Sequence, residues 1–204
     1  MFIVCLDLEG VLTPEIWEEI AKTTEINELM LTTRDIPDYD VLMKRRLKIL
    51  KDNHITLFDI KKIISNIELL PGALEFIEWL KSVTQLVIIT GSFSEFTKPL
   101  MKKLGYPLVL CHNLEIDNTG IIINYKLRIT DMKKKTVLAF KEMNYDVIAV
   151  GDSYNDIDML KEAKYGILFR PPMNIKREFS EFPSVKDYSE LKFLISTHIG
   201  LKNH

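Results

Sequence analysis

The sequence is poor in several features that would mark a specialised class of protein. It has 2 cysteines in 204 residues, and Cys5 and Cys111 are too far apart for the ligand spacing of a zinc site. No apolar run approaches the roughly 20 residues that a membrane-spanning helix needs. The net charge of −2 lacks the basic excess typical of proteins that bind nucleic acid or a membrane surface. We therefore expect neither nucleic acid nor a membrane as a partner.

Composition and the start of the chain indicate an ordinary globular protein. Hydrophobic residues make up 47% and charged residues 27% of the sequence, which is typical of soluble domains. The N-terminus lacks the basic region and the small-residue cleavage site of a secretory signal, so we expect a cytoplasmic protein. The length allows one core domain with a small second one. A homodimer is one assembly that the sequence leaves open.

The first stretch with recognisable chemistry is Phe2-Ile-Val-Cys-Leu-Asp-Leu-Glu-Gly10. Its apolar run is typical of a buried strand. Because side chains alternate along a strand, Asp7 and Glu9 should point to the same side. Two carboxylates this close require a cation, a basic group or a shared proton. These residues alone are equally consistent with a strand that runs into a solvated acidic turn.

Residues 14–69 show helical patterns only. Met43, Leu47 and Leu50 recur at helical spacing, and the stretch 56–59 resembles a capped helix start. We therefore expect an all-helical block inserted directly after the first strand.

From residue 70 onward, apolar strands alternate with helices. This alternation predicts an α/β fold in which residues 1–13 and 70–204 form a Rossmann-like parallel sheet core. The block 14–69 would then be a helical cap domain over the carboxyl edge of the sheet. The predicted strands lie at 86–89, 147–150 and 166–169, with a β-hairpin within 108–129.

Polar side chains follow three of the predicted strands where each strand ends. Because the carboxyl ends of parallel strands meet at one edge, these groups should converge in one crevice. Lys133, at a predicted helix start, would add a positive charge, and Gly91 would let backbone N–H groups approach a phosphate. Magnesium is typically held by one or two carboxylates with phosphate and water. The converging groups are Asp7, Glu9, Thr90, Ser92, Asp152, Asn155 and Asp156.

In order, and over nearly the whole chain, these motifs resemble those of the haloacid-dehalogenase-like phosphohydrolases. Lys133 fits better than Lys134 or Lys135 because of its spacing from the apolar residues of the following helix. The resemblance implies a Rossmann-like core, a small C1-type helical cap and a requirement for Mg²⁺. The motifs that carry it are Asp7-Leu-Glu-Gly-Val11, the hydroxyl of Thr90, Lys133 and Gly151-Asp-Ser-Tyr-Asn-Asp156.

The resemblance implies a role in phosphoryl transfer for each matching residue. Asp7 would take the phosphoryl group as an aspartyl phosphate, and Glu9 would act as general acid and then as base. The side chains of Asp7 and Asp152 and the backbone carbonyl of Glu9 would hold the metal. The groups that would bind substrate or phosphoryl oxygens are Thr90, Gly91, Ser92, Lys133 and Asn155, with Asn155 and Asp156 also orienting the lysine and the outer shell of the metal.

The predicted cap is similar to that of phosphoserine phosphatases. Glu15 matches the carboxylate that holds the substrate ammonium, and Arg46 matches the arginine that grips the substrate carboxylate. Lys44 and Arg45, which precede Arg46, favour the alternative of a solvated helix face. Trp17 is interpreted as a packing residue or as a border of the substrate pocket.

Asp7-Leu-Glu-Gly and the stretch 32–40 resemble a subgroup of bifunctional phosphoserine phosphatases that also transfer the phosphoryl group to homoserine. Such an enzyme would serve serine or threonine biosynthesis. The chain departs from the subgroup at Thr90-Gly91-Ser92, where the subgroup has Ser-Asp-Thr, which leaves substrate positioning there open. The alternatives are a phosphatase for another small phosphate ester and, more distantly, a non-catalytic receiver-type signalling module.

Overall fold

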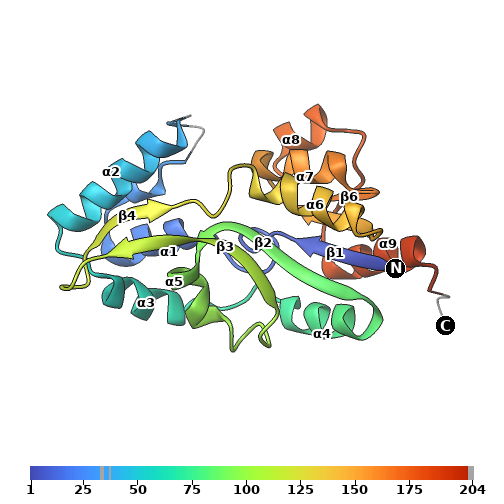
Figure 1. Cartoon of the computed structure of the whole chain (residues 1–204), viewed down its shortest axis with the longest axis horizontal. Helices are drawn as coiled ribbons and strands as arrows, with labels where there is room; N and C mark the ends of the chain where they lie inside the picture. Colours follow the sequence, from blue (N-terminus) through green and yellow to red (C-terminus); the bar gives the residue numbers. More distant parts are fainter. Residues whose placement is uncertain (33–34, 37, 202–204) are drawn as a thin grey trace.

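The computed structural model describes residues 1–32, 35–36 and 38–201 and shows the predicted α/β fold (Figure 1). Seven strands form one sheet in the order β4-β3-β2-β1-β5-β6-β7. All pairs are parallel except β3 and β4, which form the predicted antiparallel hairpin. The strands are β1 (Phe2–Leu6), β2 (Gln85–Phe93), β3 (Leu108–Ile116), β4 (Ile122–Lys126), β5 (Asp146–Gly151), β6 (Tyr165–Phe169) and β7 (Ser184–Val185).

Helices cover both faces of the sheet and bury alternate residues of its strands. On β1, Val4 and Leu6 pack into one apolar cluster, whereas Ile3 and Cys5 pack into the other, as the two-residue period of a strand requires. Figure 1 shows α4 and α9 on one face and α6, α7 and α8 on the other. These helices are α4 (Ala73–Val83), α6 (Met132–Glu142), α7 (Ile157–Glu162), α8 (Met173–Glu178) and α9 (Tyr188–Ile199).

Within the described residues, the segment between β1 and α4 contains only helical elements, as predicted. It comprises α1 (Ile16–Thr24), the 3₁₀ turn η1 (Asn27–Met30), α2 (Tyr39–Asp52) and α3 (Leu57–Ser65). Thr56 and Asp59 form the expected capping box of α3. The 32–40 motif lies partly outside the described residues, and the division into a core domain and a cap domain stays a prediction.

The helical segment between β1 and α4 follows β1 in the chain and also makes contacts with the β3–β4 hairpin. The hydroxyl of Tyr125 on β4 donates a hydrogen bond to Asp40 at 2.8 Å, and the ring of Tyr125 meets that of Tyr39 edge-on. The backbone N–H of Leu57 donates to the carbonyl of Gly120 at 2.9 Å. Figure 1 shows α2 lying along β4. These contacts hold α2 and α3 against the hairpin.

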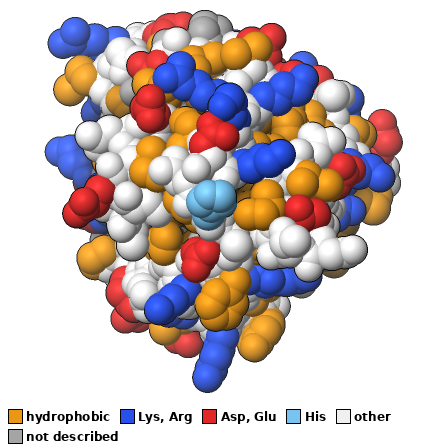
Figure 2. All heavy atoms as spheres, turned by 90° about the vertical axis from the view of Figure 1, so that its left-hand side faces the viewer, with side chains coloured by type: hydrophobic (Ala, Val, Ile, Leu, Met, Phe, Trp, Pro, Cys, Tyr) orange, Lys and Arg blue, Asp and Glu red, His pale blue; other side chains and the backbone are white. Residues whose placement is uncertain are grey.

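Figure 2 shows the face that carries α2 and the hairpin tip. Lysine and arginine side chains are mixed there with aspartates and glutamates, and the solvent face of α2 carries the ion pairs Lys44–Asp40 and Lys48–Asp52 at i,i+4 spacing. Such exposed pairs contribute little to stability because solvent screens them. Within the described part of the chain, no helix has the length and apolarity to cross a membrane.

Three details differ from the sequence-based expectation. β2 continues to Phe93 instead of ending at 90–92, with an irregular register against β3 after Ile89. Phe93, Phe96, Leu100 and Leu104 recur at helical spacing and predict a helix that Pro99 must kink or interrupt; the structure has one α-turn, α5 (Ser94–Thr97), followed by the 3₁₀ turn η2 (Lys98–Leu100). The sequence also predicts a helix from about Tyr154, where the structure has the 3₁₀ turn η3 (Tyr154–Asp156) before α7.

Candidate active site

Two aspartates and a lysine meet where β1 and β5 end. Asp7 follows β1 directly and is 4% exposed. The Nζ of Lys133, in the first turn of α6, lies 2.9 Å from Oδ2 of Asp7 and 2.7 Å from Oδ1 of Asp156. The close interaction offsets part of the cost of burying three ionisable groups together. Lys133 therefore holds two acids from different strand ends in one site.

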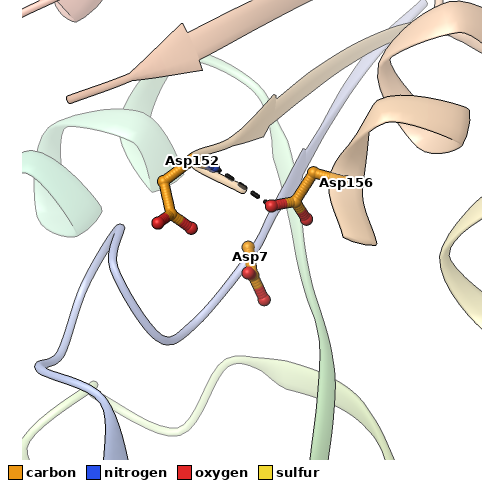
Figure 3. A group of neighbouring side chains, drawn as sticks. All are labelled: Asp7, Asp152 and Asp156. Atoms are coloured by element: carbon orange, nitrogen blue, oxygen red, sulfur yellow. Dashed lines mark hydrogen bonds between the residues drawn. The ribbon is translucent and has the colours of Figure 1, made fainter. Parts of the chain in front are cut away.

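Asp156 is fully buried, and both of its oxygens are occupied. Its Oδ2 accepts a hydrogen bond from the backbone N–H of Asp152 at 3.1 Å (Figure 3) and another from that of Ser153 at 3.1 Å. Ser153 and Asp156 form the capping box that begins η3. Asn155 accepts a hydrogen bond from Lys133 at 3.1 Å and another from the hydroxyl of Ser153 at 2.8 Å. The turn after β5 therefore fixes the position of the Lys133 ammonium group.

Asp152 is the acid whose hydrogen-bonding capacity is least used. Its Oδ1 is buried and has no hydrogen-bond partner, although a buried, unpaired acceptor costs about 1–3 kcal/mol. Burial first, and then the charge of Asp156, raise the pKa of Asp152 to about 7. One oxygen from each of Asp7, Asp152 and Asp156 lies within 4.8 Å of the others. This is the arrangement that a hard cation with oxygen ligands would relieve.

Two glycines allow the strand-end turns to approach each other this closely. A Cβ at Gly10, whose φ is +77°, would lie 2.5 Å from the carboxylate carbon of Asp152. A Cβ at Gly151 would lie 2.2 Å from the carboxylate carbon of Asp156. Any larger residue at either glycine would therefore occupy the space that the Asp152 or Asp156 carboxylate fills.

Glu9 is half-buried, and its carboxylate is held by the start of α1. Oε2 of Glu9 accepts a hydrogen bond from the backbone N–H of Ile16 at 2.9 Å. Desolvation raises the pKa of Glu9, although this N–H and the nearby Ser92 side chain act in the opposite direction. A carboxyl group whose pKa is raised by burial suits the role of a general acid.

The Thr90–Ser92 segment lies at the carboxyl end of β2, beside β1. The Oγ1 of Thr90 accepts a hydrogen bond from the backbone N–H of Ser92 at 3.1 Å. Both side chains are buried, whereas Gly91 is exposed and a Cβ there would touch nothing within 4 Å. The side chain of Ser92 lies near the Glu9 carboxylate, and the binding of phosphate by this segment stays a prediction. In the described protein, no close neighbour explains why residue 91 is glycine.

Arg46 points inward from α2 and is 7% exposed. The alternative that Arg46 lies on a solvated helix face is therefore wrong. Lys44 and Arg45 lie on that face. One terminal nitrogen of Arg46 donates to the carbonyl of Leu31 at 2.7 Å. Its Nε is buried and has no hydrogen-bond partner in the part of the chain that the structure describes. Burial lowers the pKa of Arg46 to about 10. The nearby charges of Glu9 and Glu15 act in the opposite direction.

Glu15 lies at the rim of the same site, immediately before α1. Although Glu15 keeps an exposed surface, partial desolvation, followed by the charges of Glu9 and Asp152, raises its pKa to about 8. The structure thus places an acid that can ionise near neutral pH and a buried arginine beside the Asp7–Lys133 centre.

The comparisons with known proteins agree with this geometry. A profile described as "haloacid dehalogenase-like hydrolase" matches residues 3–164. The chain belongs to this family. It is 54% identical over 192 residues to phosphoserine phosphatase ThrH of Pseudomonas aeruginosa, and the match covers 94% of each chain. It is also 54% identical over 190 residues to a phosphoserine phosphatase of Pseudomonas syringae pv. tomato, with 93% and 80% coverage.

Solved structures of phosphoserine phosphatases share the fold of this chain. A phosphoserine phosphatase in apo form superposes with a TM-score of 0.77 at 21% identity, covering 95% of this chain and 97% of the other. A phospho-aspartyl intermediate analogue of phosphoserine phosphatase gives 0.73 at 22% identity, covering 94% and 98%. At these identities the likeness establishes the fold alone.

The sequence analysis missed some members of this hydrolase's site. Ser153 was not singled out, although the Ser-x-x-Asp spacing of residues 153–156 is a readable capping signal. The backbone N–H of Ile16, which holds Glu9, carries no side-chain signature. The contact between Trp17 and Arg46 joins two helices that are distant in sequence. The first could have been predicted from its spacing, but the other two could not.

Proposed function

We propose that this hydrolase is a Mg²⁺-dependent phosphoserine phosphatase. The observation that carries the proposal is the buried guanidinium of Arg46, whose Nε has no partner and which lies near both Glu9 and Glu15. A buried arginine with a free donor is suited to an anionic group of the ligand. The phosphoserine phosphatases that are 54% identical to this chain support the choice of substrate.

The substrate offers one group for each feature of the site. The carboxylate of phosphoserine would accept hydrogen bonds from Arg46, and its ammonium would face Glu15. Its phosphate would lie beside Asp7 and within reach of the Lys133 ammonium, with Thr90 and the 91–92 backbone as further donors. Opposite charges at three points would fix the orientation of a small molecule before reaction.

In the first chemical step, a carboxylate oxygen of Asp7 forms a bond to phosphorus. The bond between phosphorus and the serine oxygen breaks, and the leaving oxygen takes the proton of Glu9. In the second step, Glu9 takes a proton from water, whose oxygen forms a bond to phosphorus. The aspartyl phosphate bond then breaks, which restores Asp7 and releases phosphate. Lys133 offsets the negative charge of the phosphoryl oxygens in both steps.

The residues at the strand ends fit a magnesium ion. Asp7 and Asp152 supply carboxylate oxygens, and we assign the backbone carbonyl of Glu9 as a third ligand. Among the described residues, Oδ1 of Asp152 has no hydrogen-bond partner, and burial and the charge of Asp156 raise the pKa of this carboxyl against the opposing charge of Lys133; both observations favour a cation at this oxygen. Asp156 is already satisfied by Lys133 and backbone N–H groups, so it supports the site. When bound, the metal would neutralise charge on the transferred group.

We further propose that homoserine can replace water in the second step. The support is the Asp7-Leu-Glu-Gly motif, in which Glu9 stands where most related phosphatases have aspartate. The homoserine hydroxyl would lose its proton to Glu9 and take the phosphoryl group from Asp7. Residues 14–69 would act as the cap domain that excludes bulk water, with 1–13 and 70–204 as the catalytic core, and the reaction would take place in the cytoplasm.

Turnover of O-phospho-L-serine with Mg²⁺ tests the proposal directly. Free phosphate and phosphohomoserine are measured separately, with and without L-homoserine. Free phosphate in the absence of acceptor is the expected result, and phosphohomoserine formed at its expense would establish the transfer. If Arg46→Ala turned over phosphoserine as efficiently as the unchanged protein, the amino-acid assignment would be wrong, and other small phosphate esters would have to be screened.

A further inference from the structure

The guanidinium of Arg46 stacks on an aromatic ring. Its Cζ lies 4.5 Å from the centre of the Trp17 indole. Trp17 comes from α1 and Arg46 from α2, so the contact joins the two cap helices. Arginine over the face of tryptophan is a favourable cation–π pair, and it is stronger when water is excluded. Arg46 is almost completely buried, so this contact belongs to the stronger kind.

The indole of Trp17 is itself held in place. Its ring meets that of Phe96 on α5 at 5.5 Å and 64°, and Phe96 in turn meets Phe93 at the end of β2 at 5.6 Å and 84°. Phe96 and Phe93 are fully buried. Trp17 is therefore supported from the core, through a row of edge-to-face rings that begins beside Ser92.

The other neighbours of Arg46 leave its plane weakly determined. One terminal nitrogen donates to the carbonyl of Leu31, and the other lies 3.9 Å from the sulfur of Met43. Among the described residues, Nε has no hydrogen-bond partner. A guanidinium held by one strong hydrogen bond can still rotate about that bond. Stacking on a flat, immobile indole removes this freedom, because it fixes the orientation of the plane.

We propose that Trp17 is a positioning residue that selects substrates bearing a carboxylate beside the phosphate ester. It fixes the guanidinium plane of Arg46, so that the free Nε–H faces the substrate carboxylate. The inference rests on the proposed function, because it assigns the anion that Arg46 receives. Trp17 also follows Ile16, whose N–H holds Glu9. If Trp17 only supported this part of the fold, replacing it would disturb Glu9 and lower activity on every substrate alike.

The test compares O-phospho-L-serine with O-phosphoethanolamine, which keeps the phosphate and the amine but lacks the carboxylate. The ratio of their kcat/KM values measures carboxylate recognition. Trp17→Leu should lower this ratio about tenfold, mainly through a higher KM for phosphoserine. Trp17→Phe retains an aromatic face and should recover part of the ratio. Trp79→Leu is the matched control, because that indole lies on α4 under Lys192 and should leave the ratio unchanged.

Arg46→Ala separates this inference from the proposed function. If Arg46→Ala lowers the ratio and adding Trp17→Leu lowers it no further, Trp17 acts through Arg46 as proposed. If Arg46→Ala lowers the ratio but Trp17→Leu does not, only the role of Trp17 is overturned. If Trp17→Leu and Trp17→Phe lowered kcat/KM equally for both substrates, the positioning role of Trp17 would be overturned and its role would be structural. If the ratio is the same in Arg46→Ala as in the unchanged protein, the amino-acid substrate fails and this inference fails with it.

Discussion

The acids of the site differ in how completely their oxygens are paired. Asp156 has a partner for each oxygen, Asp7 has Lys133 and the backbone N–H of Leu8, and Asp152 has a buried oxygen with none. Burial raises the pKa of Asp7, with the charge of Asp156 adding to it and Lys133 opposing it. An acid with one strong basic partner and access to the substrate is the best placed to form a covalent bond.

Asp7→Asn tests that assignment, because an amide cannot form the aspartyl phosphate. We expect kcat for phosphoserine to fall at least about 10⁴-fold. The fold should persist, since the amide has nearly the shape of the carboxylate. Asp158→Asn, an exposed change on α7, is the control and should keep full activity. Rapid-quench detection of protein-bound phosphate in the unchanged enzyme, but not in Asp7→Asn, would locate the intermediate. Full activity in Asp7→Asn would contradict the mechanism.

The role of Glu15 can be tested through its pKa of about 8. Only the ionised carboxylate attracts an ammonium group, so KM for phosphoserine should fall as pH rises through about 8. The control substrate is 3-phosphoglycerate, which has a hydroxyl where phosphoserine has the ammonium. Glu15→Gln should raise KM for phosphoserine by roughly 10- to 100-fold and remove this pH dependence, with little effect on 3-phosphoglycerate. Equal effects on both substrates would show that Glu15 does not bind the amine.

At the scale of elements, the turn after β1 makes a sharp prediction. Gly10 and Gly200 both have positive φ, +77° and +75°, but an added Cβ at Gly200 would meet nothing within 4 Å. Gly200→Ala should therefore cost only the backbone strain, about 1–2 kcal/mol, and leave activity intact. Gly10→Ala should cost more, because its Cβ would displace the Asp152 carboxylate, and it should weaken Mg²⁺ activation. Urea unfolding and Mg²⁺ titration of turnover measure the two effects. Equal loss of stability and unchanged Mg²⁺ dependence would contradict the close packing of Gly10 on Asp152.

The long periodic elements could be predicted from the sequence, whereas short elements and contacts between distant helices could not. The strand that leads to Asp7, the capping box at Thr56 and the hairpin around Gly120 each have a local signature. α8 (Met173–Glu178) and β7 (Ser184–Val185) are too short to show a period, so the stretch 175–182 could not be assigned. Inward pointing of Arg46 depends on packing against α1, which the residues beside it in sequence do not reveal.

At the scale of the whole molecule, the acidic cluster couples stability to pH. The folded state holds the proton of Asp152 up to about pH 7, whereas its ordinary pKa is 3.8. Between these values the folded state binds more protons than the unfolded state. The metal-free protein should therefore lose stability as pH rises from about 4 to 7, and the raised pKa of Glu15, about 8, extends the loss toward pH 8.

Mg²⁺ should reverse this loss, since it binds the ionised carboxylates. We expect the increase in Tm on adding Mg²⁺ to be larger at pH 8 than at pH 5. Asp152→Asn removes the unpaired charge, so the metal-free variant should be more stable at pH 8 by about 1–3 kcal/mol, which is roughly 2–4 °C in Tm per kcal/mol.

The same variant should lose the response of Tm to Mg²⁺, because one of the two carboxylates assigned to the metal is gone. Asp146→Asn is the control, since Asp146 forms only a partly exposed ion pair with Lys164, and it should respond to Mg²⁺ like the unchanged protein. Thermal scans at pH 5 and pH 8, with and without Mg²⁺, measure all of these values. If Asp152→Asn destabilised the metal-free protein or kept the full Mg²⁺ response, the metal would have to bind elsewhere. The expected result would show that Asp152 lowers the stability of the metal-free protein. Asp156 differs from it because Asp156 forms an ion pair with Lys133 and Asp152 does not.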